Sequence, residues 1–125
     1  MLTLIKNAEI HAPEPIGLGH VVTGGGKVLY VGGEEPDISN SLLAETVDME
    51  GRALIPGLID CHVHVTGGGG ENGFSTQAPP VPLSRFTLHG VTSVIGLLGT
   101  DDETRTTAGL LARTRALREE GLSGF

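Results

Sequence analysis

The chain has 125 residues, which suits one ordinary domain or a piece of a larger protein, and its net charge is −7 with the histidines neutral. Nucleic acids and anionic membranes attract basic surfaces, so this balance argues against both as partners. A single cysteine, Cys61, excludes an internal disulfide, and no stretch approaches the roughly 20 apolar residues of a membrane span. We therefore expect a cytoplasmic protein.

Residues 1–52 are predicted to form a small antiparallel sheet. Short apolar runs such as LTLI, AEIHA and ETVDM alternate with glycine, proline and asparagine, as is typical of strands and turns. The run HVVTGGGKVLYVG predicts a hairpin whose turn, over residues 24–26, needs the positive φ that glycine adopts readily. This segment is expected to be the first domain.

Residues 53–125 have a different pattern. A strand over 58–65 is suited to burial on both faces, and a helix over 82–89 follows it and ends at Gly90. A second strand is predicted over 91–98, and the start of a third over 122–125. Between these two strands, a helix over 106–119 has an apolar stripe formed by Leu110, Leu111, Thr114 and Leu117. Strand, loop and helix repeat, which indicates an α/β fold with a parallel sheet.

Two histidines end the first of these strands. Residues i and i+2 of a strand point to the same face, so His62 and His64 are expected to project together. Active sites of parallel α/β folds lie at the carboxyl ends of the strands, and paired imidazoles suit Zn²⁺. From the residues alone, the alternative of two partly buried histidines without a ligand role stays open.

The surrounding motifs resemble a known family. PGLIDCHVH, residues 56–64, resembles the first-strand signature of the amidohydrolase superfamily. GGGGENG at 67–73 and GVTSVIGLLGTD at 90–101 resemble the isoaspartyl dipeptidase (β-aspartyl peptidase) branch, as do LSR at 83–85 and LARTRAL at 111–117. The resemblance implies a (β/α)₈ barrel beside a small β-sandwich. Residues 1–52 would supply a sandwich segment, and 53–125 the first two βα units.

The resemblance also implies roles for particular residues. His62 and His64 would bind the more buried of two zinc ions, and Glu71 would recognise the free amine of a β-aspartyl dipeptide. Gly69 and Gly70 beside it, together with Thr100, would contact the substrate. From the residues alone, a solvated loop carboxylate is the favoured interpretation of Glu71, and a cap or turn residue is the favoured interpretation of Thr100.

Other chemically capable side chains are given structural roles. His11 and His20 are expected at the surface, Cys61 is expected in packing, and Asp60 is expected to support the histidine pair.

In the family, a carbamylated lysine, two further histidines and an aspartate come from later strands of a barrel of about 250 residues. We therefore expect the N-terminal part of a longer enzyme, and an inactive chain when this part is isolated. The resemblance also implies that the full-length protein forms homo-oligomers, octamers included. Two alternatives stay open: another amidohydrolase such as a dihydroorotase-like cyclic amidase, and a non-catalytic truncated homologue that binds metal or assists assembly.

Overall fold

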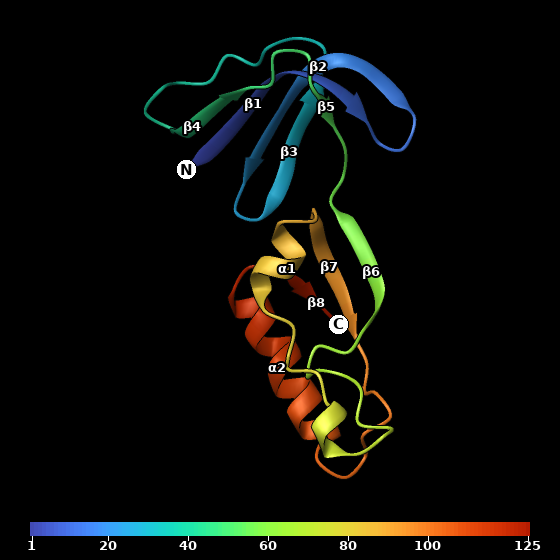
Figure 1. The fold of residues 1–125 in the computed structure, drawn as a ribbon. Coiled ribbons are helices and arrows are strands. Elements are labelled where there is room, and N and C mark those ends of the chain that lie inside the picture. Colours follow the sequence, from blue (N-terminus) through green and yellow to red (C-terminus); the bar gives the residue numbers. More distant parts are fainter. The chain divides into compact units, whose positions relative to one another are not determined.

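The structure is a computed structural model that describes residues 1–125. It contains two compact units, Met1–Pro56 and Gly57–Phe125 (Figure 1). The break therefore falls at the Pro-Gly pair, slightly later in the chain than the boundary predicted after residue 52.

The first unit is one five-stranded sheet. Its strands are β1 (Leu2–His11), β2 (Pro15–Gly24), β3 (Lys27–Gly32), β4 (Leu43–Asp48) and β5 (Ala53–Leu54). The order is β3-β2-β1-β4, with β5 also paired to β1. β2 runs antiparallel to β1 and β3, but β4 and β5 run parallel to β1. The prediction of a wholly antiparallel sheet is wrong, because the long connection over residues 33–42 leads to the far side of β1 instead of closing a second hairpin.

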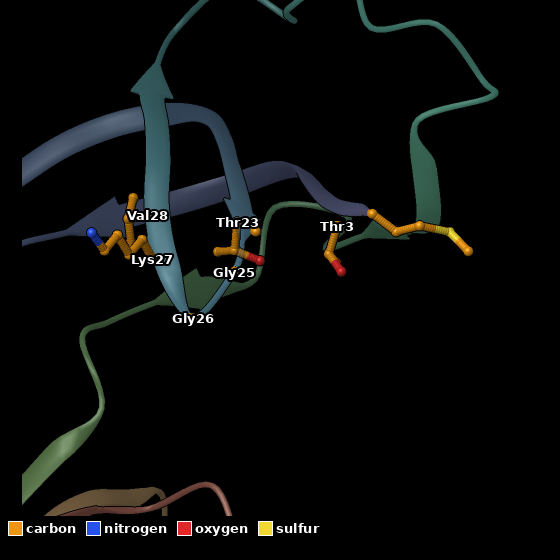
Figure 2. A pocket seen from close by; sticks show the side chains of 8 residues that line it. Thr3, Thr23, Gly25, Gly26, Lys27 and Val28 are labelled. Atoms are coloured by element: carbon orange, nitrogen blue, oxygen red, sulfur yellow. The ribbon is translucent and has the colours of Figure 1, made fainter.

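The predicted β2–β3 hairpin is confirmed. Gly25 and Gly26 form its turn with φ of +58° and +73°, the left-handed conformation that two-residue hairpin turns require. A hollow of about 370 Å³ lies beside this turn, and Figure 2 shows Thr3, Lys27 and Val28 among the residues around it. Its lining contains no histidine and no carboxylate side chain, so it offers no metal ligands of the usual kind.

The core of the first unit holds a polar side chain that was expected outside. His20 is only 8% exposed, and its Nδ1 atom has no hydrogen-bond partner. It lies on β2 within the continuous buried run 19–22, and β2 has a neighbouring strand on each side. The expectation of a surface position for His20 is wrong because the pattern of this strand did not reveal its central place in the sheet.

The second unit has a three-stranded parallel sheet. Its elements are β6 (Leu58–Val63), the short 3₁₀ helix η1 (Phe74–Thr76), α1 (Leu83–Thr87), β7 (Val91–Gly96), α2 (Thr107–Glu119) and β8 (Ser123–Gly124). The sheet order is β6-β7-β8, with both strand pairs parallel. The α/β pattern predicted for this segment, including the third strand, is therefore observed. The loops after β6 and β7 lie at the same end of the unit (Figure 1).

Both helices pack on one face of this sheet. Phe86 of α1 and Leu117 of α2 join Val63 and Val94 of the strands in a single apolar cluster. Leu111 is 51% exposed, so the predicted stripe is wrong at that position, and α2 presents Leu110, Thr114 and Leu117 to the sheet side instead. Neither α-helix combines the length and the apolar character that a membrane-spanning helix requires.

No helix of the unit covers the opposite face of the sheet. Leu58 is 50% exposed and Ile95 is 39% exposed, although the sequence predicts a first strand that is buried on both faces. Cys61 is also exposed, so its expected packing role is wrong within this unit. β6 is an edge strand here, which explains why side chains on both of its faces meet solvent.

Candidate functional site

The two histidines lie side by side at the end of β6. Their ring centroids are 5.2 Å apart and their planes are nearly perpendicular, at 89°. Val63 between them and Val65 after them are buried in the apolar cluster. The alternation of the strand therefore places both imidazoles away from the core and next to each other, as their spacing predicts.

His64 is held in a defined position. Its Nδ1 lies 3.3 Å from the Leu97 carbonyl oxygen, and the tautomer that donates a proton there leaves a free lone pair on Nε2. Gly68 and Gly99 flank the ring, since Cβ atoms built on them would lie 3.7 Å and 3.6 Å from its nearest atoms. Orientation of one ring nitrogen by a carbonyl is the usual support for a metal-binding histidine.

These residues fit part of a metal site. Two neutral imidazoles supply two nitrogen ligands, and zinc sites normally have three or four protein ligands. No group of three or more His, Cys, Asp or Glu side chains is arranged to hold a metal ion in this chain, so the pair supplies only part of a full ligand set. Asp60 accepts a hydrogen bond of 3.1 Å from the backbone N–H of His62, which is a supporting contact at the strand end.

The glycine run after the histidines packs against its own returning chain. The Ala78 N–H donates to the Gly68 carbonyl at 2.7 Å, and Gly69 bridges to Gln77. A Cβ on Gly67 would lie 2.2 Å from the Ala78 carbonyl oxygen, and one on Gly69 would lie 2.5 Å from that of Thr76. Gly67 and Gly69 are therefore needed for backbone to approach backbone.

This packing predicts unequal effects of two similar substitutions. Gly67 and Gly73 both have positive φ, +95° and +105°, but a Cβ meets backbone only at Gly67. We expect Gly67→Ala to lower the free energy of unfolding by about 1–3 kcal/mol more than Gly73→Ala, because backbone strain is common to both and the clash is not. Calorimetry of the two variants side by side measures the difference, and equal losses would show that the close approach is unimportant.

Glu71 and Thr100 meet across two loops. The Glu71 carboxylate accepts hydrogen bonds from its own backbone N–H and from the Thr100 hydroxyl, and these bonds lower its pKa, with a smaller electrostatic contribution from His64. A hollow of about 310 Å³ opens here. Its lining consists of residues 70, 71, 73, 74 and 100–103. Gly70 thus borders the same space as Glu71 and Thr100, while Gly69 is not part of this lining and bridges to Gln77.

A polar network below this hollow was not anticipated from the sequence. Asp101 is buried and accepts hydrogen bonds from the Gln77 side chain, from the hydroxyl and N–H of Thr104, and from the Glu103 N–H. Arg105 Nη1 lies 3.4 Å from the Asp101 carboxylate as an ion pair without a hydrogen bond. The Asp-x-x-Thr spacing is a detectable turn signal, but nothing local identifies Gln77 as a partner.

The network makes stability depend on pH. Hydrogen bonds from Thr104 contribute most to lowering the pKa of Asp101 in the folded chain. A carboxyl whose folded pKa is depressed stabilises the fold above its unfolded pKa, and this contribution is lost progressively as the pH falls below about 4. We expect the free energy of unfolding, measured by circular dichroism at several pH values, to fall less steeply with decreasing pH in Asp101→Asn than in the wild type. Asp102→Asn, a substitution at an exposed neighbour, should keep the wild-type slope, and equal slopes in all three proteins would contradict the assignment.

Similarity to individual known proteins gives the family, although no family model matches the chain. A crystal structure of β-aspartyl dipeptidase from Fervidobacterium islandicum AW-1, in complex with the β-Asp-Leu dipeptide, is 44% identical with a TM-score of 0.89, covering 100% of this chain and 32% of that one. An imidazolonepropionase from Acidiphilium cryptum is 32% identical over 96% of this chain and 32% of its own length. An adenine deaminase from Desulfatibacillum aliphaticivorans is 38% identical over 74% of this chain and 14% of its own length.

The chain spans about one third or less of the length of these relatives. All three belong to one superfamily of hydrolases, the amidohydrolases. The chain therefore belongs to the amidohydrolase superfamily, and it is similar over its whole length to β-aspartyl dipeptidase.

Proposed function

We propose that this chain is the N-terminal part of a longer cytoplasmic, zinc-dependent enzyme with a (β/α)₈ barrel that hydrolyses β-aspartyl dipeptides. The observation that carries the proposal is the position of Glu71. Its carboxylate is held by Thr100 and lies within electrostatic reach of His64, so a candidate amine-binding group adjoins a candidate metal ligand. The 44% identity to a β-aspartyl dipeptidase that was crystallised with β-Asp-Leu supports the same substrate class.

Each residue has a distinct task in this proposal. His62 and His64 hold zinc, and the Leu97 carbonyl fixes the orientation of the second ring. Bound zinc supplies Lewis-acid polarisation of the scissile amide. A glutamate side chain is ionised at neutral pH, and hydrogen bonds lower the pKa of Glu71 further. Its carboxylate therefore accepts a charge-assisted hydrogen bond from the α-ammonium of the β-aspartyl residue. Gly70 and Thr100 border the space around this group, and Gly69 supports the loop through its bridge to Gln77.

The charge on Glu71 also separates this proposal from the cyclic-amidase alternative. Cyclic ureides have no ammonium group to pair with a carboxylate in the binding space, and an unpaired carboxylate loses hydration without compensation when a substrate covers it. The alternative is therefore not favoured.

The direct test compares two substrates and two lengths of protein. We expect the full-length enzyme to hydrolyse β-Asp-Leu and to leave dihydroorotate unchanged, with product formation followed by ninhydrin assay or chromatography. The 125-residue chain should be inactive on both, because it provides only two metal ligands. Turnover of dihydroorotate by the full-length protein without turnover of the dipeptide would contradict the proposed substrate, and robust dipeptide hydrolysis by the isolated chain would contradict the need for later residues.

A further inference from the structure

We propose that Asp101 is a positioning residue, which fixes Glu71 against the substrate ammonium by joining the glycine loop, residues 66–78, to the loop that carries Thr100. The inference rests on the proposed function and adds to it a determinant of amine recognition that lies outside the residues contacting the substrate.

The contacts of Asp101 cross between the two loops. Asp101 follows Thr100 directly, and its carboxylate accepts a hydrogen bond from Gln77, which is 24 residues earlier in the chain. Gln77 also donates to the Thr104 hydroxyl at 3.0 Å. The returning arm of the glycine loop is thereby tied to the segment that presents the Thr100 hydroxyl to Glu71.

Arg105 extends this junction to both arms of the glycine loop. Its Nε donates to the Thr66 carbonyl at 3.2 Å, and its Nη2 donates to the Ala78 carbonyl at 2.9 Å. The guanidinium is largely buried, with 11% of its side chain exposed, and Asp101 is its ion-pair partner. Glu71 lies between these two anchored arms, on the exposed part of the loop. Its position therefore depends on groups that Asp101 holds.

Asp101 itself is not available to bind an ammonium group, although it adjoins the same hollow. One carboxylate oxygen accepts from the N–H groups of Glu103 and Thr104, at 3.2 and 2.9 Å. The other accepts from Gln77 and the Thr104 hydroxyl and faces Arg105. Both oxygens are thus occupied and the residue is 8% exposed, so its influence on the substrate passes through Glu71.

The test measures how much the α-amine contributes to substrate recognition. β-Asp-Leu and N-succinyl-leucine differ only in the α-amino group, so the ratio of their kcat/KM values in the full-length enzyme reports that contribution. If succinyl-leucine binds without cleavage, its inhibition constant replaces its KM in the comparison. We expect Asp101→Asn to lower the ratio by about 10- to 100-fold, mainly through KM for β-Asp-Leu, because small misplacements of a binding group have effects of this size.

Three further comparisons make the result decisive. Gln77→Ala removes only the side-chain link from Gln77 to Asp101 and Thr104 and leaves the contacts of Arg105 in place. It should lower the ratio in the same direction even if Asp101→Asn folds poorly. In a Glu71→Gln background, Asp101→Asn should leave the ratio unchanged, because the group that it positions is already neutral. Glu119→Gln removes an exposed carboxylate on α2 and should retain the wild-type ratio.

Equal losses on both substrates in Asp101→Asn and Gln77→Ala would assign a purely structural role and overturn the inference. A wild-type enzyme that acts on neither substrate would instead contradict the proposed function, so the two failures are distinguishable.

Discussion

Replacing His62 or His64 by alanine is expected to release zinc and to lower kcat/KM for β-Asp-Leu in the full-length enzyme by at least about 10³-fold, or about 4 kcal/mol. The two rings lie 5.2 Å apart on one side of the strand end, where one cation can take a nitrogen from each. Metal content by atomic emission and steady-state kinetics measure the two effects.

His89 provides a matched control for this loss. It is an exposed histidine after α1 whose Nδ1 lies 2.8 Å from the Arg85 carbonyl oxygen, so it is engaged in its own helix end. His89→Ala should retain both zinc and activity. Full zinc content in His62→Ala and His64→Ala would contradict a ligand role for the pair, whatever happened to the rate.

Glu71→Gln is the second substitution with a large expected effect. A charge-assisted hydrogen bond contributes about 1.5–3 kcal/mol, which corresponds to about 10- to 150-fold in kcat/KM for β-Asp-Leu. The loss should fall mainly in KM, since the ammonium is bound before and during the reaction. Thr100→Val, which removes only the hydroxyl that holds Glu71, should give a smaller loss in the same direction. Kinetics at pH 7 measure both.

Succinyl-leucine again supplies the control for Glu71. The compound lacks the ammonium, so its kcat/KM should change little in Glu71→Gln. A loss of similar size on both compounds would mean that Glu71 supports the loop and does not read the amine.

Local sequence pattern predicted much of this arrangement. Alternation in LIDCHVHV placed His62 and His64 together, and the glycines at 25 and 26 marked a turn that needs positive φ. The repeated strand–loop–helix pattern identified the parallel sheet of the second unit. Each of these features depends on residues within a few positions of one another, which a linear pattern records directly.

Features that depend on distant partners were missed. β4 pairs parallel to β1, and alternation specifies neither the partner nor the direction of a strand. The burial of His20 follows from the same sheet order. Asp101 meets Gln77 only after two loops have folded against each other, so the Asp-x-x-Thr turn signal could have indicated its local bonds but not the link between the loops. The ligand roles of the histidines and of Glu71 stay predictions.

The most direct measurement is a crystal structure of the full-length enzyme with zinc and a non-hydrolysed β-Asp-Leu analogue, with the metal located by anomalous scattering at the zinc edge. We expect one zinc ion within about 2.0–2.1 Å of a nitrogen on each of His62 and His64, and the ligand's ammonium in hydrogen-bond contact with Glu71. Zinc bound elsewhere, or an ammonium directed away from Glu71, would contradict the assignment.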